Sequence, residues 1–353
     1  MLYLDYAAST PVYPEVVEEM RYWFEEGFAN PSSNHTMGLE AKKVIDEARE
    51  FIADEIGCYP SEIIFTSGAT EANNLALKGY CLANQDKGKH IITSSIEHKC
   101  VLNTCAYLET QGFKVTYLPV KPSGHVDPLD VKNAIRPDTI LCSIMTANNE
   151  LGTVQPIQEI GKICFDTGVK FHTDAAQAVG KMDIDIDEMN LDFLSMSAHK
   201  FNGPKGIGAL FIRDAKTAKL IPVIHGAGQE LSLRGGSLPT PLIVGMHKSL
   251  QYFKSDFIKQ VKNKEHEKKF KETLNIFDQR DFVINGTQPK LPNIYNLSFK
   301  NLDVNNFIRE NFDQIALSQG SACSSKEVKA SHVLKSIGIK EKLIINNSLR
   351  ISF

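Results

Sequence analysis

Four groups of residues that can do chemistry follow separate β-rich stretches of this sequence. Asp174 ends VKFHTD, Lys200 follows SMSAH, His98 lies four residues beyond HIITS, and a turn through Ala69 and Thr70 follows EIIFT. A lysine forms Schiff bases once burial or nearby cations lower its pKa. A buried aspartate needs a cationic partner, and a protonated pyridine nitrogen is one candidate. Pyridoxal phosphate (PLP) enzymes require this pairing of lysine and aspartate.

The turn TSGAT, residues 66–70, is suited to bind a phosphate. It leads from a predicted strand into a predicted helix, where exposed amides and the positive end of the helix dipole attract anions. The backbone at Ala69 and the hydroxyl of Thr70 are the expected donors. Neither the Walker P-loop pattern nor G-x-G-x-x-G is present, so the sequence does not predict a nucleotide fingerprint.

Each of these residues also has an ordinary structural explanation. A loop lysine such as Lys200 is usually a surface residue, and a lone histidine such as His98 is usually structural. Asp174 and Thr70 could each simply cap a helix. Their common position nevertheless favours a ligand-binding site. Asn149 of NNELG follows yet another strand, and the carboxyl ends of parallel strands meet at one edge of a sheet, so these side chains are expected to lie near one another.

The elements that must position these residues alternate between strands and helices. We predict strands at 62–66, 90–94, 114–120, 139–147, 169–174, 191–197 and 207–213. Their near-continuous apolar runs are typical of a parallel sheet covered on both faces. The predicted fold class is α/β, with a mostly parallel seven-stranded sheet. We expect a large domain over residues 14–254 and a small α+β domain formed by residues 1–13 and 255–353.

The pattern changes after Pro241. One long helix is predicted for residues 242–274, and its lysine- and glutamate-rich end is typical of a solvated helix face. Three further strands are predicted at 295–299, 313–319 and 347–353. They would form the sheet of the small domain.

Composition excludes several classes of function. A net charge of −3 gives no reason to expect nucleic acid or an anionic membrane as partner. No apolar run approaches the roughly 18 residues of a membrane helix, and MLYLDYAAST is not a signal peptide. The sequence therefore predicts a cytoplasmic protein.

The seven cysteines are scattered, with no Cys-x-x-Cys pair and no spacing typical of metal ligands. We therefore predict reduced thiols and no metal site. Cys58, Cys81, Cys142 and Cys164 lie in apolar or helical stretches and are expected to be buried small hydrophobes. Cys323 differs, because GSACSSK surrounds it with small polar residues in a loop, where it is either a bystander or a nucleophile.

Together these stretches resemble the PLP-dependent cysteine desulfurases of the NifS/IscS type, within the class-V aminotransferase group. The matching stretches are YLDYAASTPV (3–12), NPSSNH (30–35), FTSGATEANNLALKG (65–79), HIITSSIEHKCVL (90–102), NNELGTVQPI (148–157), HTDAAQAVGK (172–181), SMSAHKFNGPKGIGALF (195–211), RGGSLPTP (234–241) and SQGSACSS (318–325). The resemblance spans nearly the whole chain in order. It implies fold type I of the PLP-dependent transferases.

The resemblance implies a role for each matching position. Lys200 would form the Schiff base and transfer protons, Asp174 would hold the ring nitrogen, and His98 would stack on the ring and act as an acid–base partner. The other cofactor contacts it implies are Ala69, Thr70, Asn149, Gln177, Ser197, His199 and, from the partner subunit of a homodimer, Ser237. Asn149 and Arg350, assisted by Asn34, would hold the substrate carboxylate. Cys323 would be the persulfide carrier.

The implied reaction converts L-cysteine to L-alanine and passes the sulfur through a persulfide to an acceptor. Iron–sulfur scaffold proteins, transfer-RNA thiolation and other thio-cofactor routes are the implied destinations. The loop SQGSACSS matches this branch and not the branch with an R-x-G-H-H-C pattern. Departures are Gln319 and Ser237, where serine and threonine are usual. Relatives also continue past the position of Phe353 through a helical stretch that, in the IscS branch, contacts the scaffold protein.

Two other functions are compatible with the same residues. A class-V aminotransferase, or a lyase that eliminates sulfur from cysteine or selenium from selenocysteine, would share the PLP site, and only Cys323 and its loop separate these activities. A non-catalytic PLP-fold protein that handles sulfur is the third possibility. The intact Lys200, Asp174 and His98 argue against it.

Overall fold

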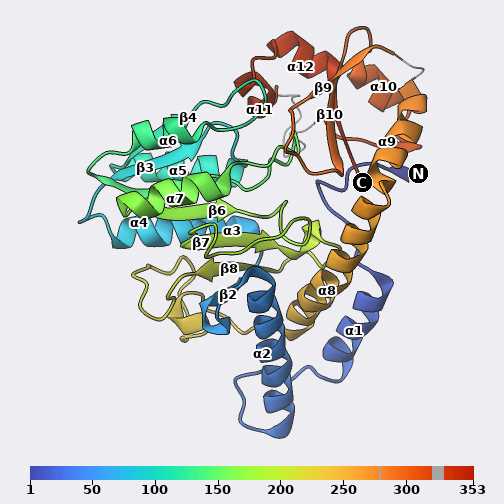
Figure 1. Cartoon of the computed structure of the whole chain (residues 1–353). Coiled ribbons are helices and arrows are strands. Elements are labelled where there is room, and N and C mark those ends of the chain that lie inside the picture. Colours follow the sequence, from blue (N-terminus) through green and yellow to red (C-terminus); the bar gives the residue numbers. More distant parts are fainter. Residues whose placement is uncertain (278–279, 320–329) are drawn as a thin grey trace.

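The computed structural model describes residues 1–277, 280–319 and 330–353 (Figure 1). Its main sheet contains β2 (Ile63–Thr66), β3 (His90–Ser94), β4 (Lys114–Leu118), β5 (Thr139–Ser143), β6 (Lys170–Asp174), β7 (Phe193–Ser197) and β8 (Gly208–Ile212). The strand order is β2-β8-β7-β6-β5-β3-β4. Strand β8 runs antiparallel to β2 and β7, and the other pairs are parallel. The predicted seven-stranded, mostly parallel sheet is confirmed.

Helices cover both faces of this sheet. One face packs against α2 (Thr36–Ile56), α6 (Pro128–Ala134), α7 (Ile157–Thr167) and α8 (Thr240–Lys262), and the other against α3 (Ala69–Asn74), the π-helical turn Leu75–Gly79, α4 (Tyr80–Ala83) and α5 (Lys99–Thr110). Successive side chains of a strand point to opposite faces. Ile63 and Phe65 accordingly belong to the first buried cluster and Ile64 to the second. Burial on both faces explains why the strands are apolar throughout.

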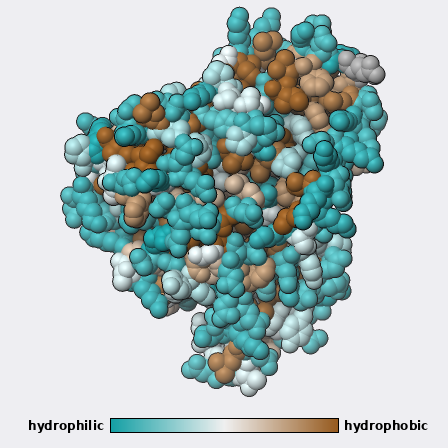
Figure 2. Space-filling model, viewed as in Figure 1, coloured by the Kyte–Doolittle hydropathy of each residue, from teal (hydrophilic) through white to brown (hydrophobic). Residues whose placement is uncertain are grey.

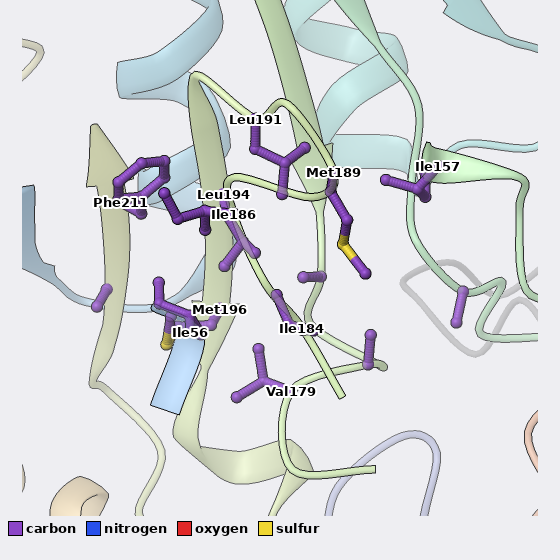
Figure 3. Packing of buried hydrophobic residues seen from close by; sticks show 14 of the residues in the cluster. Ile56, Ile157, Val179, Ile184, Ile186, Met189, Leu191, Leu194, Met196 and Phe211 are labelled. Atoms are coloured by element: carbon purple, nitrogen blue, oxygen red, sulfur yellow. The ribbon is translucent and has the colours of Figure 1, made fainter. Parts of the chain in front are cut away.

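The first cluster also includes the segment that follows β6. Figure 3 shows Ile184, Ile186 and Met189 of this segment among the same buried side chains as Leu194 and Met196 of β7. The connection between β6 and β7 is therefore packed against the sheet. This packing fixes the carboxyl ends of both strands, where site residues were predicted.

A smaller unit is built from both chain ends. Strands β9 (Phe282–Asn285), β10 (Ile294–Phe299) and β12 (Ser348–Ser352) form an antiparallel sheet in the order β12-β10-β9, while β1 (Leu2–Tyr3) pairs in parallel with β11 (Ile315–Ala316). Its helices are α9 (Glu265–Leu274), α10 (Val304–Glu310), α11 (His332–Ser336) and α12 (Glu341–Asn347). Leu4 packs in one cluster with Leu297 and Ile351. The two termini lie side by side in Figure 1.

The predicted single helix over residues 242–274 is wrong in one respect, because it is two helices. Helix α8 ends at Lys262 and α9 begins at Glu265. Lys264 has a φ of 54°, in the left-handed region that ends helices. Glu265 and Glu267 then occupy the first turn of α9, where negative charge is favourable. The expected domain limit at residue 254 falls inside α8.

Several elements had no clear counterpart in the sequence pattern. Helix α1 (Pro14–Glu25) packs against α8, and short 3₁₀ turns lie at Pro60–Glu62, Ala198–Lys200, Glu230–Ser232 and Asn275–Phe277. Strand β9 was also missed. It lies at the edge of its sheet, and its Val283 and Ile284 are exposed, so its apolar residues do not mark a buried face.

The visible face of the molecule is largely hydrophilic, with hydrophobic patches that are small and separate (Figure 2). Among the described helices, none combines the length and the apolar character needed to cross a membrane.

Candidate active site

A cavity of about 490 Å³ lies at the carboxyl ends of the central strands. Most of the predicted site residues line it: Ala69, Thr70, His98, Asn149, Asp174, Gln177, Ser197, His199, Lys200 and Arg350. This position agrees with the general rule that open α/β sheets bind ligands beyond the carboxyl ends of their strands. The convergence expected from the strand order is therefore present in the structure.

Lys200 is positioned by the end of β7 and by the N-terminal segment. It closes the 3₁₀ turn Ala198–Lys200, which follows β7 directly. Its Nζ donates hydrogen bonds to the carbonyl oxygens of Ala7 and Ala8, each at 2.8 Å. The amine is thereby held at the lining of the cavity. Residue type does not predict this role for Ala7 and Ala8, because any residue could supply the backbone carbonyl.

Asp174 is almost fully buried at the end of β6, with 5% of its surface exposed. Its Oδ2 accepts a hydrogen bond from Nδ2 of Asn73 at 2.8 Å, and its Oδ1 accepts one from the backbone N–H of Ala176 at 3.0 Å. Both donors are neutral, and no salt bridge to Asp174 is present within the described part of the chain. Burial of a carboxylate charge is costly unless a cation joins it. The site therefore suits a positively charged group of a ligand.

His98 begins helix α5 and acts as its N-cap. Its Nδ1 accepts a hydrogen bond from the backbone N–H of Cys100 at 3.2 Å, so the neutral imidazole carries its hydrogen on Nε2. Burial lowers the pKa of His98, which favours this neutral form. The resting ring can therefore donate a proton from Nε2.

Cys100 is a cavity-lining thiol that the sequence analysis did not single out. Its Sγ lies 3.0 Å from Nδ1 of His98 and 3.1 Å from Nδ2 of Asn73. Burial raises the pKa of the Cys100 thiol to about 12. Since the thiolate is the nucleophilic form of cysteine, Cys100 is a poor nucleophile despite its position.

The turn before α3 forms a cradle lined by hydroxyl groups. Gly68 has a φ of 144°, and a Cβ at this position would lie 3.4 Å from Oγ of Ser197. Glycine thus allows the backbone to approach Ser197 with space left in the cavity, which Thr70 also lines. Burial, followed by nearby lysines, lowers the pKa of His199 to about 4. Lys200 and Lys205 are among those lysines, so the surroundings favour an anion.

Arg350 enters the cavity from β12 with only 2% of its surface exposed. Its Nη2 donates to Oδ1 of Asp5 at 2.6 Å, and its Nη1 donates to the backbone carbonyl of Asn149 at 2.8 Å. Its Nε has no hydrogen-bond partner within the described part of the chain. The guanidinium is therefore held in place by the N-terminal segment and by the loop that follows β5.

Helix α11 is joined to the main sheet by two contacts that the sequence analysis missed. Oγ of Ser331 donates to Oε2 of Glu150 at 2.5 Å, and Nε2 of His332 lies 2.9 Å from the carbonyl oxygen of Glu97. Burial raises the pKa of the Glu97 carboxyl to about 8. Glu97 and Glu150 directly adjoin the predicted site residues in SIEHK and NNELG, and this adjacency is the only sequence feature that could have indicated them.

Three predicted residues are not placed in the cavity. Asn34, just before α2, and Ser237, in the loop before α8, are exposed and do not line the cavity. Their roles stay predictions. Cys323 lies outside the described residues.

Comparison with known proteins agrees with this geometry. The family Aminotransferase class-V matches residues 2–353. The chain is 46% identical over 346 residues to Cysteine desulfurase IscS of Rickettsia massiliae (strain Mtu5), a match that covers 97% of this chain and 84% of that protein. A structure of SspA in complex with cysteine superposes with a TM-score of 0.90 at 46% identity, covering 100% of this chain and 99% of that one.

A NifS-like protein gives the same TM-score of 0.90 at 35% identity and covers 100% of this chain and 93% of that one. The matches extend along the whole chain in both sequence and structure, and they confirm the predicted resemblance. The chain belongs to the class-V aminotransferase family, in the group of PLP-dependent cysteine desulfurases that includes the IscS and NifS-like proteins.

Proposed function

We propose that this protein removes sulfur from L-cysteine, leaves L-alanine, and carries the sulfur as a persulfide on Cys323. The observation that carries the proposal is one cavity in which Lys200, Asp174 and His98 face Arg350. An amine, a buried carboxylate, an imidazole and a guanidinium are the groups that an amino-acid substrate and PLP require. The similar SspA has been seen in complex with cysteine, which supports the choice of substrate.

The residues present fit PLP. The buried carboxylate of Asp174 would meet the protonated ring nitrogen, and Lys200 would hold the aldehyde group. The phosphate would occupy the cradle at Gly68. Its other proposed contacts are Ala69, Thr70, Ser197 and His199. When bound, PLP supplies an electron sink for bond breaking at the carbon that carries the substrate amine.

The chain's own residues supply the remaining steps. Arg350, with Asn149 beside it, binds the substrate carboxylate. Lys200 moves protons at the substrate carbons, and His98 exchanges a proton through Nε2. The Cys323 thiolate attacks the substrate sulfur, so that an S–S bond forms while the C–S bond breaks. The electron pair of the broken bond stays on carbon, which takes up a proton and becomes the methyl group of alanine.

The acidity of Cys100 argues against it as the attacking thiol. The attacking group must be a thiolate, and burial raises the pKa of Cys100 to about 12. The small polar residues of GSACSSK predict a loop around Cys323, and a thiol in such a loop could deliver sulfur to a second protein. We propose a thiol-bearing acceptor protein, for which an iron–sulfur scaffold is one candidate, and a cytoplasmic reaction, where thiols stay reduced.

The test is mass measurement of the peptide that carries Cys323 after incubation with L-cysteine. We expect a mass gain of one sulfur atom there, and equal amounts of sulfide and alanine once reductant is added. The variant Cys323→Ser should bind PLP and release no sulfide, while the matched variant Cys100→Ser should still acquire sulfur at Cys323. Sulfide release by Cys323→Ser at the wild-type rate would contradict the persulfide role. Pyruvate in place of alanine would indicate a β-eliminating lyase.

We also infer a homodimer in which Ser237 serves the partner's cavity. The loop that carries Ser237 is exposed, and two salt bridges hold it in place. Glu230 pairs with Arg49 at 2.6 Å and Arg234 pairs with Glu71 at 3.0 Å. The loop region exposes several large apolar side chains, namely Ile221, Val223, Ile224 and Leu231. A fixed apolar surface of this kind suits contact with a second copy.

Subunit mixing tests this arrangement. Mixed dimers of Lys200→Ala and Ser237→Ala chains would contain one cavity that has both native residues. We expect the mixture to regain activity that neither variant shows at the same concentration, and sedimentation to give a dimer. A monomer, or a mixture no more active than its parts, would contradict the inference.

A further inference from the structure

Lys181 is a lysine behind the site that the proposed reaction does not use. It lies in the turn after β6, four residues beyond Gln177, and its Nζ donates a hydrogen bond to Oε1 of Gln177 at 2.9 Å. Lys181 lines a second cavity, of about 910 Å³, between the N-terminal segment, α8 and α9. Lys200 lines this second cavity as well as the first, so Lys181 stands directly behind the site.

The hydrogen bonds of Gln177 connect Lys181 to Lys200. Nε2 of Gln177, which is 3% exposed, donates to the carbonyl oxygen of Ala7 at 2.8 Å. The same oxygen accepts the hydrogen bond from Nζ of Lys200. The two ends of a glutamine amide have nearly equal size, so its hydrogen-bond partners decide which end points where. Lys181 donates to one end of the amide and the Ala7 carbonyl can only accept from the other, and together they select one orientation of Gln177.

The charges around Lys181 make its position unfavourable for stability alone. Burial, and then the cations Lys200 and Arg350, lower the pKa of Lys181 to about 7. His199 and His266 also face it, and the positive charge of Lys181 contributes to lowering the pKa of each. The groups that interact with Lys181 through their charge are thus themselves cationic or able to become so. A lysine kept among cations in this way points to a function.

We propose that Lys181 is a positioning residue: it fixes the amide of Gln177 so that its N–H end faces the site. The amide nitrogen has two hydrogens. One binds the Ala7 carbonyl, and the other is available to the phenolic oxygen of PLP. A reversed amide would instead direct its oxygen at both the Ala7 carbonyl and the cofactor oxygen. The proposal rests on the proposed function, because it requires bound PLP.

The test is a pH titration of the absorbance of bound PLP in the substrate-free holoenzyme. A hydrogen bond to the phenolic oxygen stabilises its deprotonated form and lowers the midpoint of that titration. We expect Lys181→Met to raise the midpoint by about one pH unit. Gln177→Leu should raise it similarly. The double variant should show no further rise, since both substitutions remove the same hydrogen bond.

The matched control is Lys269→Met. Lys269 lines the same second cavity from α9, yet it is not among the hydrogen-bond partners of Gln177. We expect the wild-type midpoint from this variant. A shift as large as that of Lys181→Met would overturn the proposal, because it would reveal a general effect of charge in the second cavity.

The outcomes separate this proposal from the proposed function. A wild-type protein that takes up no PLP overturns both. If the wild type binds PLP and titrates, two results overturn the role of Lys181 alone. One is a Lys181→Met midpoint equal to that of the wild type, and the other is a shift in the double variant equal to the sum of the two single shifts. Thermal unfolding of the apoproteins checks folding, and Lys181→Met should be at least as stable as wild type because it removes a cation from a cationic cluster. If it does not fold, Lys181→Ala replaces it in the same titration.

Discussion

The two sides of the cavity are assembled in different ways. One side, which we call the floor, consists of His98, Asp174 and Lys200, each within four residues of the end of a strand of the main sheet. The other, which we call the wall, consists of Arg350 and His332. Arg350 reaches the site through its pairing with Asp5, 345 positions away in the chain, and His332 through a bond to Glu97. The groups that would do the chemistry thus lie at the strand ends of one sheet, while Arg350, which would bind the substrate carboxylate, depends on contacts between distant parts of the chain.

The largest effect should come from the floor. Lys200→Ala removes the amine that would transfer protons, and we expect activity to fall by at least about 10³-fold. The fold should survive, because the hydrogen bonds that the structure describes for Lys200 are made to the backbone carbonyls of Ala7 and Ala8, which remain in the variant. Sulfide and alanine release measure the activity, and circular dichroism checks the fold. Turnover within tenfold of wild type would contradict the role of the floor.

On the wall, Arg350→Ala should damage both binding and stability. It leaves Asp5 without its cation in a largely buried position, and we expect the free energy of unfolding to fall by about 3 kcal/mol. KM for L-cysteine should rise. The matched control is Lys335→Ala, which breaks the exposed pair with Glu341 and should cost less than about 1 kcal/mol. If urea unfolding gave the same loss of unfolding free energy for both variants, the buried pair of Arg350 would contribute no more than an exposed surface pair.

Glu97, which precedes the floor residue His98, should make the free energy of unfolding depend on pH. Burial raises the pKa of its carboxyl to about 8 from an ordinary value of 4.5. Between these values the folded state holds a proton that the unfolded state has lost, so this group makes stability fall as pH rises. In Glu97→Gln the free energy of unfolding should therefore fall less steeply with rising pH, by up to about 1.4 kcal/mol per pH unit.

The measurement for Glu97 is urea unfolding of the apoprotein between pH 5 and pH 8, a range chosen from these pKa values. Glu341→Gln, on the exposed face of α12, serves as control and should follow the wild-type curve. Parallel curves for wild type and Glu97→Gln would show that Glu97 ionises normally in the folded protein.

The smallest effect should come from a support of the wall. Ser331→Ala removes the hydrogen bond to Glu150 and the cap of α11, at a cost of about 1–3 kcal/mol in the free energy of unfolding. Ser336→Ala, in the same helix, should cost no more than about 0.5 kcal/mol. Hydrogen exchange in α11 would locate the effect. No difference between the two serines would mean that the bond to Glu150 does not anchor the helix.

The same contrast explains what could be predicted from the sequence. All seven strands of the main sheet and the floor residues were foreseen, because a strand buried on both faces is recognisable from its own residues and its end marks an edge. The role of Arg350 was predicted only from the resemblance to the cysteine desulfurase family. The bonds of Lys200 to Ala7 and Ala8, and of Ser331 to Glu150, involve backbone atoms or distant partners that leave no local pattern. The division of residues 242–274 into two helices was missed because the break lies at Lys264. This residue adopts a left-handed conformation, but lysine is not a residue type that normally signals the end of a helix.

The pairing of Asp5 with Arg350 also imposes an order on biosynthesis. All strands of the main sheet lie between residues 63 and 212, so the floor can form while the polypeptide is still growing. The guanidinium of Arg350, which we propose binds the substrate carboxylate, is added only when synthesis reaches residue 350, and β12 can then pair with β10. A translation product that ends before residue 350 would contain the floor residues but lack the proposed ligand of the substrate carboxylate. The proposed substrate-binding arginine is therefore added last, after the sheet that positions the floor residues has been synthesised.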